Sequence, residues 1–227
     1  MAQQSQRALL ADPKIQTPGS WNSTCRFSIL TPTYNRAHTL SRLYTSLENQ
    51  NFADMEWIIV DDGSTDETET IVAELAANSS FPVRYFYQEN QHKKSAVNRC
   101  VSMANGLMST VVDSDDELAD QALLQFWEAW QALPDTLQQK LVGIRALCCD
   151  HAGQIIGSPF PMEGMKSTPA ELQYRYRVEG DKASCERTEI LRKFPFNDDV
   201  TGFVMEGTVW NEIAKYHKTS CSNFHKH

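Results

Sequence analysis

Acidic side chains are concentrated in one short segment of this sequence. Four of the five residues 113–117 are acidic, and the run directly follows the apolar stretch Thr110-Val111-Val112. Asp113 and Asp115 are one residue apart in an extended segment, so their carboxylates point the same way and can hold a hard divalent cation such as Mg²⁺ or Mn²⁺. Such an ion would neutralise a diphosphate and stabilise it as it leaves. The segment therefore predicts a metal site for a diphosphate-bearing ligand.

Other sites for metals or phosphates do not fit the spacing. A calcium-binding EF-hand loop needs Gly at its sixth position, where this sequence has Leu118. Neither GxxxxGK[ST] nor GxGxxG occurs, which excludes a P-loop and the dinucleotide-binding fingerprint. A phosphatase of the haloacid type is disfavoured, because Glu117 stands where its motif has Thr.

Two further polar clusters follow short apolar runs. Thr31-Pro32-Thr33-Tyr34-Asn35 closes the run that begins at Phe27, and Asp61-Asp62-Gly63-Ser64 follows Trp57-Ile58-Ile59-Val60. Each cluster alone is typical of a helix cap. Because the carboxyl ends of parallel strands lie at the same edge of a sheet, the three clusters together predict a binding site there.

The elements that must position these clusters alternate along the chain. Short β-rich runs alternate with segments that repeat apolar residues at helical spacing. This alternation predicts an α/β fold with a mostly parallel, Rossmann-like sheet flanked by helices. The expected strands are 27–31, 57–60, 83–87, 110–112 and 143–149, and the expected helices include 38–50, 96–103 and 121–133. Loops are expected over 151–182, and helices over 189–193 and 208–216.

Composition narrows the class of protein. The formal net charge of -8 and a pI near 5.2 exclude a partner held mainly by counterion release, so no nucleic acid is expected. No signal peptide and no apolar stretch of membrane-spanning length is found, and the six cysteines form no CxxC pair. These features favour a cytoplasmic protein with reduced thiols and no transmembrane segment.

Four blocks of this sequence, in order, resemble one known family. They are SILTPTYNRAHTLSRLYTSLENQ, WIIVDDGSTDET, QENQHKKSAVNRCVSMANG and VVDSDDEL, with GDKASCERTEILRKFPFND and GFVMEGTVWNEIAKY further on. The chain is similar to inverting family 2 glycosyltransferases of the GT-A fold over about residues 26–218. The resemblance implies a single GT-A domain, with a nucleotide-binding half (26–118) and an acceptor-side half (119–218). Residues 1–25 are expected to be a flexible arm, and 219–227 a C-terminal tail.

The resemblance also implies roles for single residues. Asp61 would accept a hydrogen bond from the base or ribose, with Asp62 supporting its turn, and Asp115 would ligate the metal. Asp113 would reach the ribose or the metal. Lys93 would be the basic group beside the nucleotide. The nucleotide contacts implied in full are Pro32, Thr33, Tyr34, Asn35, Asp61, Asp62, Lys93, Ala96, Asn98, Asp113 and Ser114.

Two catalytic candidates lie in the second half. Glu206, just ahead of an amphipathic helix, is the candidate base that takes the acceptor's proton. Asp181 is expected to face the acceptor or the donor sugar. The alternatives stay open for both, because Glu206 fits a helix-capping carboxylate and Asp181 fits a turn aspartate.

The expected activity is therefore transfer of a sugar, with Mn²⁺ or Mg²⁺, from a nucleotide-sugar to a hydroxyl acceptor. A UDP-sugar donor and a saccharide or lipid-linked acceptor are implied, as in surface polysaccharide or glycolipid synthesis, with peripheral membrane association left open. Two departures are notable: Gln91-His92 stands where relatives have small glycines, and the sequence stops soon after Glu206. A degenerate or truncated relative that binds the nucleotide-sugar without turnover is the alternative.

Overall fold

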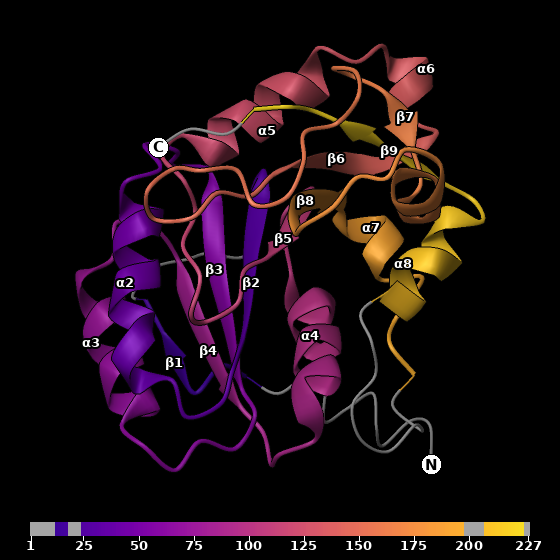
Figure 1. Cartoon of the computed structure of the whole chain (residues 1–227). Helices are drawn as coiled ribbons and strands as arrows, with labels where there is room; N and C mark the ends of the chain where they lie inside the picture. The colour runs from indigo at the N-terminus through magenta and orange to yellow at the C-terminus, as the bar shows by residue number, and fades with distance from the viewer. Residues whose placement is uncertain (1–11, 18–23, 198–206, 225–227) are drawn as a thin grey trace.

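A single sheet runs through the residues that the computed structural model describes, which are 12–17, 24–197 and 207–224. Within them, nine strands lie in the order β1-β4-β3-β2-β5-β8-β6-β9-β7 (Figure 1). The strands are β1 (Ile15–Gln16), β2 (Phe27–Thr33), β3 (Met55–Asp61), β4 (Val83–Tyr87), β5 (Met108–Val111), β6 (Leu141–Leu147), β7 (Lys166–Ser167), β8 (Lys182–Arg187) and β9 (Lys218–Cys221). The helices are α2 (Ala37–Glu48), α3 (Thr68–Asn78), α4 (His92–Met103), α5 (Ala122–Gln131), α6 (Asp135–Gln138), the π-helical turn η1 (Glu171–Arg175), α7 (Thr188–Leu191) and α8 (Gly207–Ala214).

The parallel strands β4, β3, β2 and β5 form the first half of the sheet. Every residue of β2 and β3 is buried, as expected of strands covered on both faces. Strand β8 is antiparallel to both β5 and β6, so it joins the second half to the first. The predicted α/β fold with a mostly parallel sheet is confirmed.

Pro32 does not end its strand, contrary to the prediction. Strand β2 continues to Thr33, and Pro32 pairs with Val60 of β3. The carbonyl of Leu30 faces β5 and accepts from Val112, whereas the carbonyl of Thr33 faces β3 and accepts from Asp62. Backbone groups of successive residues point to opposite sides of a strand, so the nitrogen of Pro32 points to the side of β5. Strand β5 ends at Val111, which pairs with Leu30, and so does not extend to Pro32. Its missing N–H therefore costs no ladder hydrogen bond.

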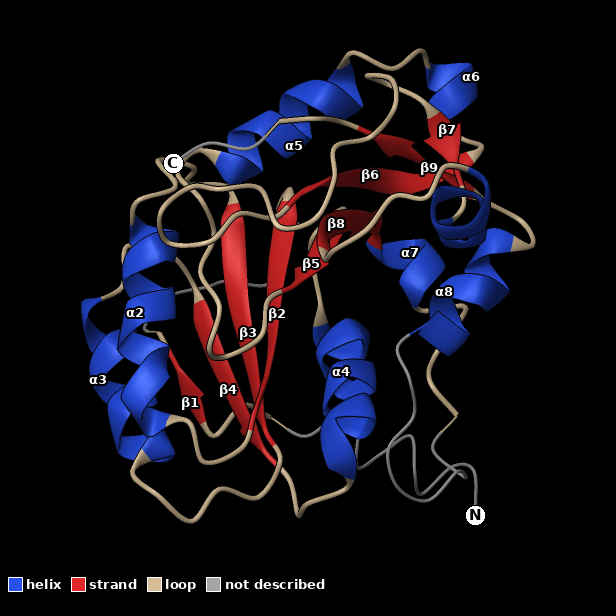
Figure 2. Cartoon of the chain, viewed as in Figure 1, coloured by secondary structure: helices blue, strands red, loops and turns tan. Residues whose placement is uncertain are grey.

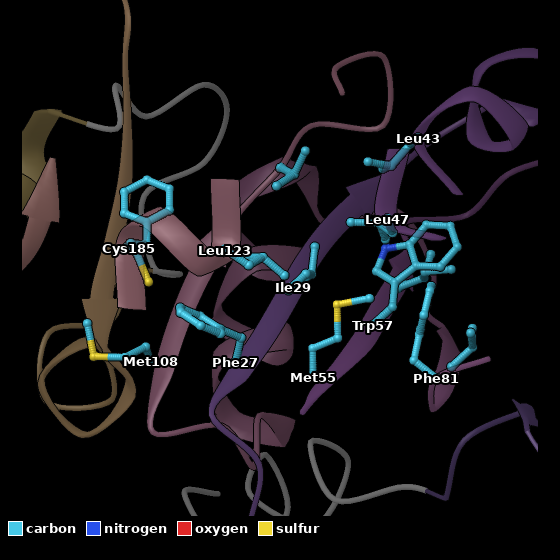
Figure 3. Close-up of a cluster of buried hydrophobic side chains, with 14 of the residues drawn as sticks. Phe27, Ile29, Leu43, Leu47, Met55, Trp57, Phe81, Met108, Leu123 and Cys185 are labelled. Atoms are coloured by element: carbon cyan, nitrogen blue, oxygen red, sulfur yellow. The ribbon is translucent and has the colours of Figure 1, made fainter. Parts of the chain in front are cut away.

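Helices cover both faces of the sheet (Figure 2). Alternate side chains of β2 point to opposite faces, so Ile29 packs with α2, α3 and α5 while Leu30 packs with α4, α7 and α8. Figure 3 shows the first of these cores, in which Phe27, Ile29 and Trp57 of the sheet meet Leu43 and Leu47 of α2. Among the described residues, no helix combines the length and apolar character needed to cross a membrane.

Both ends of the described chain contribute strands, which corrects two predictions. Within the predicted flexible arm, β1 pairs antiparallel with β4, and Lys14 N donates to Tyr85 O at 2.7 Å. Within the predicted tail, residues 219–221 belong to β9, which lies between β6 and β7 with Cys221 fully buried. Strands this short carry no hydrophobic period, and their partners are distant in sequence. Composition alone could not reveal them.

The boundaries of other elements also differ from the predictions. Helix α4 begins at His92 instead of residue 96, and the segment 151–182, expected to be loops, contains β7 and η1. The first turn of α4 consists of polar residues, so it lacks the apolar spacing from which a helix is predicted.

Candidate functional site

Three polar loops meet at the carboxyl edge of the parallel strands. They follow β2, β3 and β5 and comprise residues 34–36, 62–67 and 112–117. Asn35 N donates to Ser64 Oγ at 2.8 Å, and Thr65 N donates to Asn35 Oδ1 at 2.8 Å, so the first two loops are tied together. The guanidinium of Arg36 lies 3.4 Å from the carboxylate of Asp115, which links the third loop. The structure thus assembles the three clusters at one edge.

Asp61 and Asp62 shape the loop after β3. Asp61 is 1% exposed; its Oδ1 accepts from Ser64 N at 2.7 Å and its Oδ2 from the Tyr85 hydroxyl at 2.6 Å. Burial, together with the bond to Asp61, raises the pKa of Tyr85, so this hydroxyl stays protonated as a donor. Asp62 accepts from Gln88 Nε2 at 2.7 Å and from Gln91 N at 2.9 Å. Asp62 therefore fixes the start of the segment that leads into α4.

The end of β2 offers one exposed aromatic ring. Pro32 and Thr33 are buried within the strand, whereas Tyr34 is 49% exposed. The Thr33 hydroxyl is buried and has no hydrogen-bond partner among the described residues. Asn35 adopts a left-handed backbone with φ of 52°, a conformation that Asn tolerates better than most residues. Of the four predicted contacts in this loop, Tyr34 presents the most surface.

Three carboxylates of the acidic loop, residues 112–117, are paired with cations from other elements. Lys93 Nζ lies 2.8 Å from Asp113, and Arg36 lies 3.4 Å from Asp115. Arg42 of α2 lies 2.9 Å from Glu117 and also donates to the Asp115 carbonyl. The side chains of Asp113 and Asp115 remain 38% and 50% exposed, so solvent reaches both. Ser114, between them, is buried.

Two of these cations were not predicted from the sequence. Lys93 was the only basic residue expected at this edge of the sheet, but Arg36 and Arg42 also lie there. Arg36 directly follows Asn35 in the loop after β2, so its position alone was a signal that could have found it. Arg42 lies within α2 and carries no such signal.

Asp181 comes within electrostatic reach of the acidic loop. Partial burial raises the pKa of Asp116, and the charges of Asp113, Asp115 and Asp181 raise it further, while Lys93 opposes them. The position of Asp181 toward the acceptor or the donor sugar stays a prediction. Glu206, the other catalytic candidate, lies outside the described residues.

Two predicted nucleotide contacts on α4 do not fit their positions. Ala96 is completely buried and packs in the core with Leu30 and Val60. Asn98 uses its side-chain amide to donate to Phe196 O at 2.9 Å and to accept from Phe196 N at 2.8 Å. Only the first turn of α4 lies beside the acidic loop, where Lys93 reaches Asp113. Residues one or more turns further along the helix pack against the protein instead.

The acidic loop has the chemistry of a Mg²⁺ or Mn²⁺ site that the protein completes only in part. Carboxylate oxygens are hard donors that these ions prefer. Among the described residues, no group of three or more His, Cys, Asp or Glu side chains is placed to hold a metal. Mg²⁺ is commonly held by one or two carboxylates, with waters and substrate phosphates as the other ligands. Asp113 and Asp115 supply two such carboxylates, but the predicted extended segment is wrong, because Asp116 N donates to Asp113 O at 3.0 Å and closes a turn there.

Two hollows lie elsewhere on the described residues. One, of about 550 Å³, is lined by Gly106, Met108 and Arg187 at the amino end of β5. The other, of about 290 Å³, is apolar and is lined by Val97, Phe196 and other residues. Neither is lined by the acidic loop.

Comparisons with known proteins agree with this geometry. The family model described as "Glycosyl transferase family 2" matches residues 28–145. A Campylobacter jejuni protein named GalNAc(5)-diNAcBac-PP-undecaprenol beta-1,3-glucosyltransferase is 35% identical over 84% of this chain and 60% of its own length.

Solved structures extend the likeness to the fold. S. aureus TarS, residues 1–349 in complex with UDP, has a TM-score of 0.70 and 21% identity, covering 88% of this chain and 59% of that one. The mannosyltransferase PcManGT from Pyrobaculum calidifontis, in complex with GDP-Man and Mn²⁺, has a TM-score of 0.61 and 18% identity, covering 98% and 60%. The chain therefore spans about three fifths of the length of these relatives.

Proposed function

Because this chain belongs to glycosyl transferase family 2, we propose that it transfers a sugar from a nucleoside diphosphate sugar to an acceptor hydroxyl. The observation that carries the proposal is the meeting of the acidic loop with the loops after β2 and β3. Ligands of open α/β sheets bind at this edge. Here it offers an exposed ring at Tyr34, cations at Arg36 and Lys93, and a carboxylate pair at Asp113 and Asp115.

The proposed donor is a UDP-sugar. TarS, one structural neighbour, has been captured with UDP, whereas the mannosyltransferase neighbour carries GDP-Man and Mn²⁺. In our proposal the base and ribose lie against Tyr34 and the loop held by Asp61, and the diphosphate lies toward Arg36 and Lys93. A divalent ion held by Asp113 and Asp115 would neutralise the diphosphate and favour its departure.

The proposed reaction is a direct displacement. The acceptor oxygen forms a bond to the anomeric carbon, the bond from that carbon to the diphosphate oxygen breaks, and UDP leaves with the electron pair. A carboxylate takes the acceptor's proton. Glu206 is the proposed base, and Asp181 is proposed to contact the donor sugar or the acceptor from the side of Asp116.

The proposed acceptor is a lipid-linked saccharide. The Campylobacter relative is named for a saccharide joined through a diphosphate to undecaprenol, and that name supplies the class of acceptor. An acceptor on a lipid places the reaction at a membrane surface.

Calorimetric titration with UDP, with and without Mn²⁺, tests the donor site on the wild type and on Asp115→Asn. We expect binding by the wild type that strengthens with Mn²⁺ and that loses this dependence in Asp115→Asn. Arg26→Gln is a suitable control, because Arg26 pairs with Asp54 at the opposite edge of the sheet. Absence of UDP binding by the wild type under both conditions would overturn the proposal.

Turnover is tested separately by hydrolysis of UDP-sugars in the presence of Mn²⁺. We expect slow release of UDP by the wild type and a loss of at least about 100-fold in Glu206→Gln, the size typical of removing a general base. Binding without hydrolysis or transfer for any UDP-sugar would instead support a nucleotide-sugar-binding protein without turnover.

A further inference from the structure

An exposed run of alternating tyrosine and arginine lies on the acceptor half of the molecule. Its residues are Tyr174, Arg175, Tyr176 and Arg177, at the end of η1, and all four are exposed. Tyr174 is 78% exposed and Tyr176 38% exposed, so their rings face solvent. We refer to these four residues as the Tyr-Arg run.

The two arginines of this run have no acidic partner among the described residues. The protein has 29 acidic and 21 basic residues, and acidic partners are therefore abundant. Among the described residues, however, the guanidinium of Arg177 forms no hydrogen bond or ion pair, and that of Arg175 only lies over the Tyr176 ring at 5.3 Å. By contrast, ion pairs occupy Lys14, Arg26, Arg36, Arg42, Lys93, Arg187, Lys215 and Lys218. Two exposed arginines, two residues apart in the chain, are thus available to an anion outside it.

The backbone of the Tyr-Arg run is fixed by hydrogen bonds and by a buried leucine. Leu172 is buried beneath the turn, and Glu171 accepts from Thr168 N at 3.0 Å and from Lys218 Nζ at 3.0 Å. Val178 N donates to Leu172 O at 2.9 Å and closes the turn from the other side. Arg177 adopts a left-handed backbone with φ of 54°, which is unfavourable for Arg and persists only where the surrounding contacts impose it. The side chains are therefore presented from a fixed backbone.

The run is also close to the proposed site along the chain. Asp181, whose charge acts on Asp116 of the acidic loop, follows Arg177 by four residues. Extended residues span at most about 3.5 Å each, so the run lies within roughly 15 Å of Asp181. The Tyr-Arg run and Asp181 therefore belong to the same region of the chain.

We infer that the Tyr-Arg run docks the protein on an anionic phospholipid bilayer. Guanidinium groups bind phosphates through paired hydrogen bonds, and tyrosine rings prefer the depth of lipid head groups. An exposed, solvent-facing run suits an extended surface better than a small solute, which binds in a concave pocket. The inference rests on the proposed function for its purpose, because a lipid-linked acceptor would be met at such a surface.

Co-sedimentation with vesicles tests this inference on the full 227-residue chain. Vesicles of phosphatidylcholine are compared with vesicles that contain about 30% phosphatidylglycerol, at low salt and at about 0.5 M NaCl. We expect the wild type to bind the anionic vesicles at low salt. Arg175→Gln with Arg177→Gln should weaken this binding roughly 30-fold, about fivefold for each arginine removed near an anionic surface. Tyr174→Ser should weaken it further by removing a ring from the interface.

A matched control removes two exposed cations elsewhere, by Lys14→Gln with Lys215→Gln, and should bind the vesicles much more like the wild type. The inference is overturned if the wild type binds neither kind of vesicle, if both double variants bind equally, or if neutral vesicles bind as well as anionic ones. Titration with UDP distinguishes failure of this inference from failure of the proposed donor site. A Tyr-Arg variant that no longer binds vesicles but still binds UDP supports the inference. Absence of UDP binding by the wild type would count only against the proposed function.

Discussion

At the scale of single residues, two of the three aspartates of the acidic loop form ion pairs with cations from two other elements. Lys93 pairs with Asp113, and Arg36 pairs with Asp115. Both pairs are about half exposed, so each contributes little to stability. Their importance is electrostatic, because a divalent ion at the aspartates would compete with the same cations, which would then be available to a diphosphate.

Removing Arg36 should therefore have opposite effects on two ligands. In Arg36→Gln, we expect Mn²⁺ alone to bind about two- to fivefold more tightly, because a competing cation is gone. We expect UDP with Mn²⁺ to bind more weakly, because a partner of the diphosphate is gone. Calorimetry on the wild type and the variant measures both values. A variant that binds both ligands more weakly would show that Arg36 only maintains the shape of the loop.

A buried carboxyl group gives the protein a distinct pH dependence. Glu186 in β8 is buried, and burial raises its pKa to about 7, although Ser184 and Arg145 oppose the shift. A carboxyl whose pKa is raised by folding costs nothing below its unfolded pKa of about 4.5, and its cost grows as the pH rises toward 7.

Replacing this carboxyl group tests the predicted direction of the pH dependence of stability. Glu186→Gln should be more stable than the wild type at about pH 8 by up to about 3 kcal/mol, with the advantage shrinking toward pH 5. Urea unfolding at both pH values measures the difference, and the exposed Glu189→Gln serves as control. An advantage that is larger at pH 5 would contradict the assignment.

At the scale of elements, the parallel strands and their loops were predictable because their signals are local. The apolar runs at 57–60 and 83–87, each followed by polar residues, identify strands that end at one edge. The strands β1 and β9 were missed because they gain their stability from distant partners. The same limit applies to Ala96, since one helix turn decides whether a residue meets the site or the core. The pairing of Arg42 with Glu117 likewise depends on how α2 packs.

The start of α4 contains a residue in a conformation that favours glycine. His92 has φ of 70°, beside Lys93 of the site. His92→Gly should relieve this strain and stabilise the protein by about 0.5–1 kcal/mol. Gln91→Gly is the matched control, because Gln91 has φ of -130° and gains nothing from glycine. Urea unfolding of the three proteins checks the order. Equal midpoints for His92→Gly and Gln91→Gly would show that the left-handed backbone stores no strain.

At the scale of the whole molecule, β8 makes one cooperative unit of the two halves. It pairs with β5 of the parallel half of the sheet and with β6 of the other half, and its Cys185 belongs to the core that contains Phe27 and Trp57 (Figure 3). A sheet and core shared in this way should unfold as a whole.

A close contact between β6 and β8 allows a test of this unity. A Cβ on Gly143 would lie 1.9 Å from the carbonyl oxygen of Cys185, so Gly143→Ala should destabilise the protein by about 2–4 kcal/mol. We expect far-UV circular dichroism and tryptophan fluorescence to report the same lowered midpoint. Gly207→Ala, with open space around its Cβ, should change stability little. Separate midpoints for the two signals would mean that the halves unfold independently.

The position of β9 also constrains how the chain can fold during its synthesis. β6 and β7 are made first, yet β7 pairs only with β9 among the described strands, and β9 also covers one edge of β6. Until residue 221 has emerged from the ribosome, a nascent chain therefore carries β6 with an open edge that can pair with other chains. The strands β2, β3 and β4 have their partners once β5 is made, whereas β5 also waits for β8. Slow translation between residues 147 and 221 should thus favour aggregation more than a pause at any earlier position.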